Sequence, residues 1–111
     1  MPERPAGYGS TTAEASHWTF LTSHAHVLLC LATDPAIRVR DIAEAVGITE
    51  RATLRILHDL AQAGYVTSER IGRRNHYRLH PSAAMRHPME RATPVGVLID
   101  ALVQAGFHAT R

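Results

Sequence analysis

Four arginines and two histidines lie within fourteen residues of this 111-residue chain, in the segment SERIGRRNHYRLHP at 68–81. Guanidinium groups stay charged at every physiological pH and pair with phosphate or carboxylate through two parallel hydrogen bonds. Residues 70–91 hold six arginines and one acid, whereas residues 1–69 hold five arginines and eight acids. The formal net charge is only +2, so the basic character is local. This pattern predicts a surface that binds an anionic partner.

A metal site is the second chemistry that the residue types suggest. His26 and Cys30 are four residues apart, the spacing of one helix turn, with His17 and His24 nearby. Such a pair could hold a thiophilic or borderline ion. However, Cys30 is the single cysteine and lies in an apolar run, where lone cysteines usually pack in the core. We therefore predict no metal and no cofactor.

Catalysis has little support in the sequence. Cys30 near a histidine is a weak nucleophile candidate, and the chain has neither a glycine-rich phosphate loop nor a pair of carboxylates suited to acid–base work. One cysteine fits a reducing compartment, and neither a signal peptide nor a membrane-length apolar stretch is present. The sequence predicts a cytoplasmic protein that is not an enzyme.

Helical periodicity organises the first half of the chain. Residues 1–16 are rich in Pro, Gly, Ser and Thr and are expected to form a disordered arm. A first helix is predicted from Trp18 to Thr33, followed by a candidate short strand at 36–38. VRDIAEAVG predicts a second helix that ends at Gly47, and Thr49 is expected to cap a third helix that stops at Gly64. The short connection forces the second and third helices to cross steeply.

The apolar period changes to two after Gly64. YVTSERI and HYRLH are predicted strands joined by the reversing loop GRRN, with Tyr77 and Leu79 facing the core. A connector at 82–92 leads to a last helix at 93–108, with Thr93 as its cap and Pro94 at its start. The predicted fold class is mainly α with a small β-hairpin: a winged helix-turn-helix at 17–81 with an added C-terminal helix.

The segments VRDIAEAVGITERATLRILHDLAQAGYV and RIGRRNHYRL resemble the DNA-binding core of small bacterial regulators of the MarR and ArsR families. The resemblance covers about residues 25–79. It implies a dimeric transcriptional regulator, nucleoid-associated when bound, with the third helix in the major groove and the hairpin as a wing. The expected partner is double-stranded DNA carrying a pseudo-palindromic operator.

The side chains of the third helix that face the core determine which of its other side chains can reach DNA. If Thr53, Ile56, Leu57 and Leu60 face the core, the opposite face offers arginines for guanine or phosphate and a leucine for a thymine methyl. Wing residues are expected on the backbone or in the minor groove. The predicted DNA-binding residues are Arg40, Thr49, Glu50, Arg51, Leu54, Arg55, Arg70, Arg73, Arg74, Asn75 and His76.

The last helix is predicted to form a homodimer, because its apolar stripe is wide for a small core. The alternative is packing of this helix on the chain's own first helix. The predicted interface residues are Trp18, Leu21, Val95, Leu98, Ile99, Leu102 and Val103. Two other functions stay open: a metal-responsive ArsR-like sensor, and a winged-helix protein interaction module without direct DNA readout. The sequence does not identify an effector.

Overall fold

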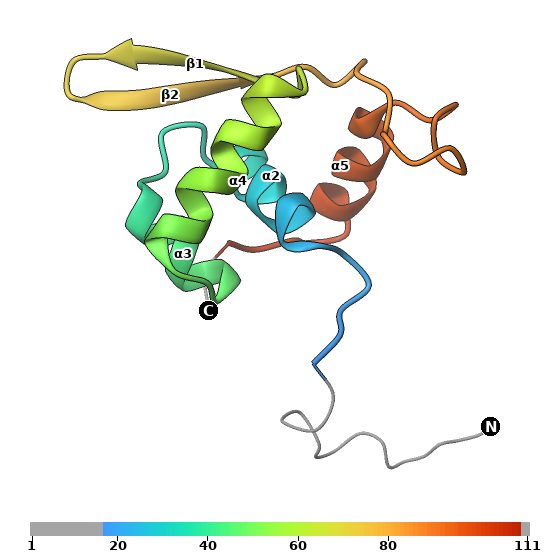
Figure 1. The fold of residues 1–111 in the computed structure, drawn as a ribbon, viewed down its shortest axis with the longest axis horizontal. Helices are drawn as coiled ribbons and strands as arrows, with labels where there is room; N and C mark the ends of the chain where they lie inside the picture. The colour runs from blue at the N-terminus through green and yellow to red at the C-terminus, as the bar shows by residue number, and fades with distance from the viewer. Residues whose placement is uncertain (1–16, 110–111) are drawn as a thin grey trace.

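Four helices and one antiparallel hairpin make up the computed structural model, which describes residues 17–109. In chain order the elements are α2 (Ser23–Thr33), α3 (Val39–Val46), α4 (Glu50–Gln62), β1 (Val66–Ile71), β2 (Arg74–Leu79) and α5 (Val95–Gln104) (Figure 1). The predicted α+β winged-helix fold with an added C-terminal helix is confirmed. The expected disordered arm at 1–16 lies outside the described residues.

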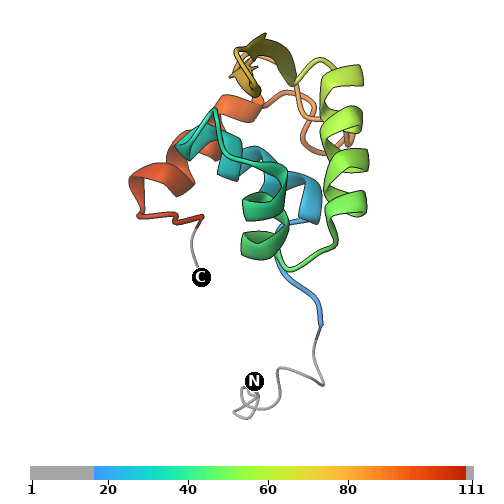
Figure 2. The same cartoon turned by 90° about the vertical axis from the view of Figure 1, so that its left-hand side faces the viewer.

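Helix α2 is the central element. It contacts α3, α4, α5 and β2, and lies between α4 and α5 in both views (Figures 1 and 2). Five consecutive residues, Val27 to Leu31, are buried, so the middle of the helix is covered on every side. The predicted start at Trp18 is wrong: the helix begins at Ser23, because the Thr22 hydroxyl accepts a hydrogen bond from the Ala25 amide at 3.1 Å.

The helix-turn-helix follows the sequence pattern closely. Gly47 ends α3 with φ of 88°, a left-handed conformation that glycine adopts without strain. Thr49 caps α4 as predicted, accepting from the Ala52 amide at 3.0 Å. The predicted inward stripe of α4 is buried, and Ile42 and Ala43 bury the inner face of α3. The orientation of α4 about its own axis is therefore fixed by its packing on α2 and α3.

The candidate strand at 36–38 does not form. Pro35 and Ala36 lie in a turn in which the Asp34 carboxylate accepts from the Ala36 amide at 3.1 Å, and α3 begins directly afterwards. The turn is still close to the hairpin, because the Tyr77 amide donates to the Pro35 carbonyl at 3.0 Å. This backbone contact joins the base of the wing to the start of the helix-turn-helix.

The wing is a two-stranded ladder with Val66 opposite Leu79 and Ile71 opposite Arg74. The predicted four-residue loop GRRN is shorter in the structure: only Gly72 and Arg73 form the turn, and Arg74 and Asn75 belong to β2. Gly72 has φ of 63°, which suits a tight two-residue hairpin turn. Tyr77 is buried and Leu79 half-buried, so both face the core as predicted. The tip beyond them projects away from the body (Figure 1).

The connector folds back onto the start of α5. Its carbonyls at Ala83 and Pro81 accept from the Val95 and Gly96 amides, both at 2.8 Å. These two bonds satisfy the first donors of the helix, a task that helix N-terminal side chains usually perform. Thr93 is therefore not the cap that the sequence predicts; Pro94 occupies that position, and no side chain caps the helix.

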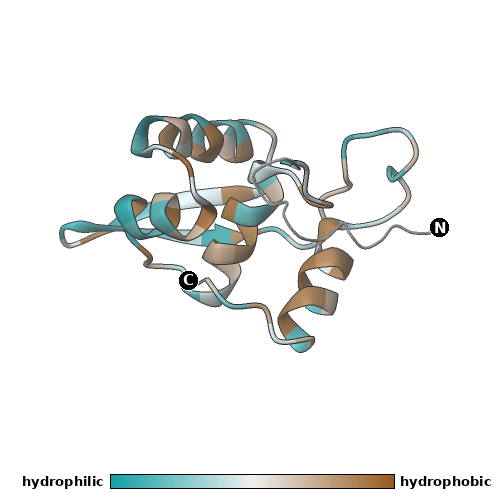
Figure 3. Ribbon diagram, turned by 90° about the horizontal axis from the view of Figure 1, so that it is seen from below, coloured by the Kyte–Doolittle hydropathy of each residue, from teal (hydrophilic) through white to brown (hydrophobic). Residues whose placement is uncertain are grey.

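One core joins all these elements. Its cluster runs from Val27 in α2 through Ile56 in α4 and Tyr77 in β2 to Ile99 in α5. The hydropathy colouring of Figure 3 shows α5 as largely hydrophobic and the projecting hairpin as largely hydrophilic. No helix within residues 17–109 is long and apolar enough to cross a membrane.

Gly96 tests the contact between the connector and α5. A β-carbon at this position would lie 2.7 Å from the Pro81 Cβ and 2.9 Å from its carbonyl oxygen. We expect Gly96→Ala to lower the free energy of unfolding by about 1–3 kcal/mol, because the clash outweighs the better helix propensity of alanine. Urea unfolding measures this. Asp100→Ala, exposed on the same helix, should leave stability unchanged or slightly higher. An equally stable Gly96→Ala chain would contradict the packing described.

Candidate nucleic-acid interface

The outer face of α4 presents two arginines around an apolar side chain. Arg51, Leu54, Arg55 and His58 are all exposed, and Leu54 keeps 56% of its surface in contact with solvent. This is the face that the buried stripe predicts. Guanidinium donors suit guanine edges or phosphates, and a leucine methyl suits a thymine methyl. The composition of the face therefore fits the major groove of DNA.

Neither arginine on this face is held by a neighbour. Within residues 17–109, the side chains of Arg51 and Arg55 have no ion pair or hydrogen bond. Asp59, one turn after Arg55, instead receives a hydrogen bond at 2.9 Å from His24 of α2. That bond, together with the positive groups nearby, holds the pKa of the Asp59 carboxyl below its usual range. The simple explanation of a surface row of intrahelical ion pairs is therefore not supported for Arg55.

The first turns of α4 and α3, with the cap of α4, supply three more predicted residues. The Thr49 side chain is occupied as a helix cap, and its carbonyl accepts from the Thr53 hydroxyl at 2.9 Å. Glu50 lies exposed in the first turn, where a negative charge stabilises the helix dipole. Arg40 is exposed on α3. Thr49 and Glu50 thus have clear structural tasks besides any contact with DNA.

The wing arginines differ in what they contact. Arg73, at the turn, has no side-chain partner among the described residues. The Arg70 Nε group donates a hydrogen bond to the Gly72 carbonyl at 3.4 Å. The Arg74 guanidinium donates to the Ala36 carbonyl in the turn before α3. Arg74 therefore helps to anchor the wing, and Arg73 has its charge free for a partner.

Strand register divides the remaining wing residues between two faces. Arg70 lies opposite Asn75, on the face that Tyr77 buries at its base. Arg74, His76 and Arg78 follow each other at alternate positions on the other face. Arg78 is exposed but is absent from the predicted set. The alternation of HYRLH carries the signal that would have included it.

The residues predicted for a dimer interface fall into two groups. Val95 and Ile99 are buried in the chain's own core, because α5 packs on α2. Leu21, Leu98 and Leu102 are half-buried, while Trp18 and Val103 are exposed. The alternative weighed from the sequence, packing of the last helix on the first, therefore accounts for the inner residues of α5. Only the outer residues are accessible to a second copy.

The pair of candidate metal ligands on α2 is unsuited to binding an ion. Cys30 is 1% exposed, and burial raises the pKa of its thiol, which disfavours the thiolate that metals require. Across residues 17–109, no three His, Cys, Asp or Glu side chains gather closely enough to hold a metal ion.

Comparison with known families bears on the fold and the site together. Residues 19–85 match the model of the Rrf2 family, described as iron-dependent transcriptional regulators. The match spans the helix-turn-helix, the wing and the start of the connector, which is more than half of the chain. It supports a winged-helix regulator and replaces the narrower MarR and ArsR resemblance. No curated protein matches the chain.

Proposed function

The chain belongs to the Rrf2 family of DNA-binding transcriptional regulators, and from that premise we propose that it reads a specific operator as a homodimer. Helix α4 enters the major groove, and the wing contacts the flanking backbone or minor groove. The observation that carries this proposal is the outer face of α4, where two unpaired arginines flank an exposed leucine. Leu54 packs against no part of the chain's own core, so its methyl groups are accessible to a partner.

The iron dependence in the family description does not fit the residues of this chain. Iron–sulfur clusters are held mainly by several cysteine thiolates, and this sequence has one cysteine, which is buried. Non-haem iron commonly needs two histidines and a carboxylate on one site, and no such group is present within residues 17–109. The proposed function therefore contains no iron-dependent step.

Direct DNA readout separates this proposal from a protein interaction module. A module of that kind has no need of unpaired groove-facing arginines or a basic hairpin. Binding of the full chain to random duplex DNA at low and moderate salt is the first measurement, followed by selection of bound sequences from a random pool. A chain that binds no duplex even at low salt would not be a DNA-reading regulator.

The wing arginines make a matched pair for testing backbone contacts. We expect Arg73→Ala to weaken binding to every duplex and to reduce the slope of log affinity against log salt by about one, since one phosphate contact is lost. Arg74→Ala should instead speed amide exchange at Tyr77, because Arg74 holds the wing to the turn before α3. If the salt slope is unchanged in Arg73→Ala, the tip of the wing does not contact DNA phosphates.

The preference of the protein for particular DNA sequences should depend on the exposed side chains of α4. We expect Arg51→Ala to relax preference at one base pair in each half-site, with a loss of roughly 1–3 kcal/mol in discrimination, and to leave random-duplex binding nearly intact. Leu54→Ala should cause a smaller loss of base preference, at a position where the operator has a thymine. Competition among single-base operator variants measures both, with Arg91→Ala as an exposed control. Equal losses on every variant would mean that Arg51 only holds phosphate.

The dimer is proposed because DNA half-sites are read by two-fold symmetric proteins and because the chain leaves apolar surface uncovered. Trp18 is 71% exposed and Val97, on the outer side of α5, is 56% exposed. We expect Val97→Glu to shift the chain from dimer to monomer in sedimentation, since a charge would be buried at the interface. Met89→Glu, another exposed apolar position, should leave the dimer intact. A dimer that survives Val97→Glu would exclude this flank of α5 as its interface.

A further inference from the structure

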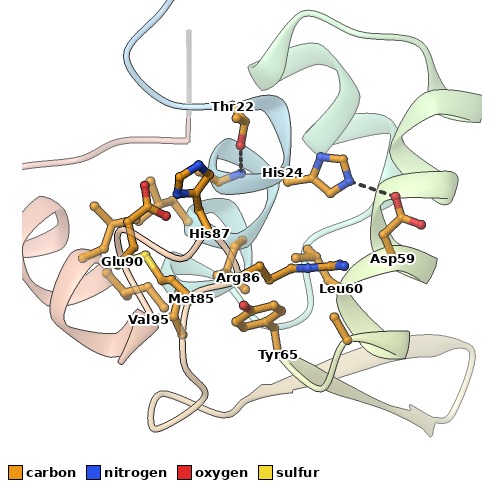
Figure 4. A pocket seen from close by; sticks show the side chains of 16 residues that line it. Thr22, His24, Asp59, Leu60, Tyr65, Met85, Arg86, His87, Glu90 and Val95 are labelled. Carbon is orange, nitrogen blue, oxygen red and sulfur yellow. Dashed lines mark hydrogen bonds and ion pairs between the residues drawn. The ribbon is translucent and has the colours of Figure 1, made fainter. Parts of the chain in front are cut away.

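A cavity of about 410 Å³ lies between α2, the end of α4, the start of α5 and the connector (Figure 4). This volume falls in the range of natural small-molecule sites. The DNA interface uses none of the side chains that form its floor. Its position also differs from that of Cys30, which does not line it.

The floor of the cavity is apolar. It is built from leucines of α2 and α4 and from the first residues of α5, with Met85 from the connector at its side (Figure 4). The residues that form it are Leu28, Leu29, Leu60, Val95 and Ile99. A ligand for this floor needs an apolar body, because polar groups placed there would find no hydrogen-bond partners.

Most polar groups around the cavity are already paired. The Tyr65 hydroxyl donates to the Ala84 carbonyl at 2.6 Å, and His24 is hydrogen-bonded to Asp59. The His87 ring accepts from the Met89 amide at 3.0 Å. The side chains of Arg86 and Glu90 have no ion pair or hydrogen bond among the described residues. These two charges remain for a ligand.

The two unpaired charges lie on different sides of the cavity. Figure 4 shows the Arg86 side chain extending past Tyr65 toward Leu60, whereas Glu90 lies beside His87 and Val95. The guanidinium presents parallel donors that match a carboxylate. Of the two acids that line the cavity, Asp59 is already hydrogen-bonded to His24 and Glu90 lies on the side of His87, so the Arg86 guanidinium is left as an unpaired donor for a carboxylate.

We infer that this cavity is a binding site for a small carboxylic acid with an apolar body. The apolar body lies on the leucine floor, and the carboxylate pairs with Arg86. Both features are needed. The floor provides affinity through burial of the apolar body, and the guanidinium provides selectivity for an acid.

Occupancy of this site acts on DNA binding, a consequence that rests on the proposed function. Asp59 and Leu60 line the cavity from the same helix that presents Arg51 and Arg55, and Tyr65 lies directly before the wing. A ligand changes DNA affinity to the extent that it favours one orientation of these elements over another. The binding of the acid itself does not depend on this consequence.

The test uses the full chain and two carboxylic acids of different shape, octanoate and 2-naphthoate, each with its amide and its primary amine. Calorimetry gives the affinities, and thermal unfolding gives an independent measure through the stabilisation by bound ligand. We expect both acids to bind about tenfold or more tightly than their amides, since a charge-assisted bond is lost, and the amines to bind no better than the amides.

Arg86→Gln and Arg91→Gln make the same change of charge five residues apart, but only Arg86 lines the cavity. Arg86→Gln should abolish the preference for acids, whereas Arg91→Gln should keep it. Leu98→Phe, at a half-buried lining position of α5, should weaken acids and amides alike by filling the cavity, without lowering the unfolding temperature. These results together would place the acid in this cavity.

Three outcomes would overturn the site. Equal binding of acids and amides would show that Arg86 does not pair with the carboxylate. Tighter binding of the amines would show that Glu90 binds the charged group of the ligand. If no probe binds, the cavity does not take the proposed ligand. If the acids bind as expected but operator affinity is unchanged, the site stands and its regulatory consequence is wrong. If they bind and the chain binds no DNA, the proposed function fails alone.

Discussion

The structure depends on the complete burial of the middle of α2. A run of five consecutive buried residues, Val27 to Leu31, cannot be covered by one neighbouring face, because successive helix residues point in directions about 100° apart. The helix-turn-helix covers one side, and α5 with the connector covers the other. The C-terminal helix is therefore part of the core of a single domain, even though it follows a complete winged helix in the sequence.

This constraint links the face of α4 to the rest of the chain. Because α2 holds the inner stripe of α4, the outward direction of Arg51 and Leu54 is set by core packing and needs no ligand. The hydrogen bond between His24 and Asp59 adds a second tie between the two helices at the rim of the cavity. The side chains that we propose to face the groove are thus positioned before DNA binds, which would lower the ordering cost of binding.

Local sequence patterns correctly predicted the features of the fold that depend on neighbouring residues. Gly47, Thr49 and the inward stripe of α4 are capping and periodicity signals, and the structure has them where the sequence predicts. Two contacts that the sequence does not indicate depend on distant residues. Thr93 loses the cap of α5 to connector carbonyls, and the partner of Arg74 lies 38 residues away, at Ala36. The cavity is likewise absent from any local pattern, because it is formed by four separate segments. Long-range contacts of this kind leave no spacing rule in a single sequence.

Two kinds of regulatory site can be compared in this chain, an iron site and the cavity beside α4. Iron–sulfur clusters are held mainly by several cysteine thiolates, and the one cysteine of this sequence is buried in the core. The surface between α4 and the connector instead combines an apolar floor with an unpaired guanidinium. Both kinds of site can bias the same helix, because regulation requires only a ligand with different affinities for two arrangements. A shared winged-helix scaffold therefore does not fix the chemistry of the signal, and the acid that we propose for the cavity would act through the end of α4 and through Tyr65, the residue before the wing.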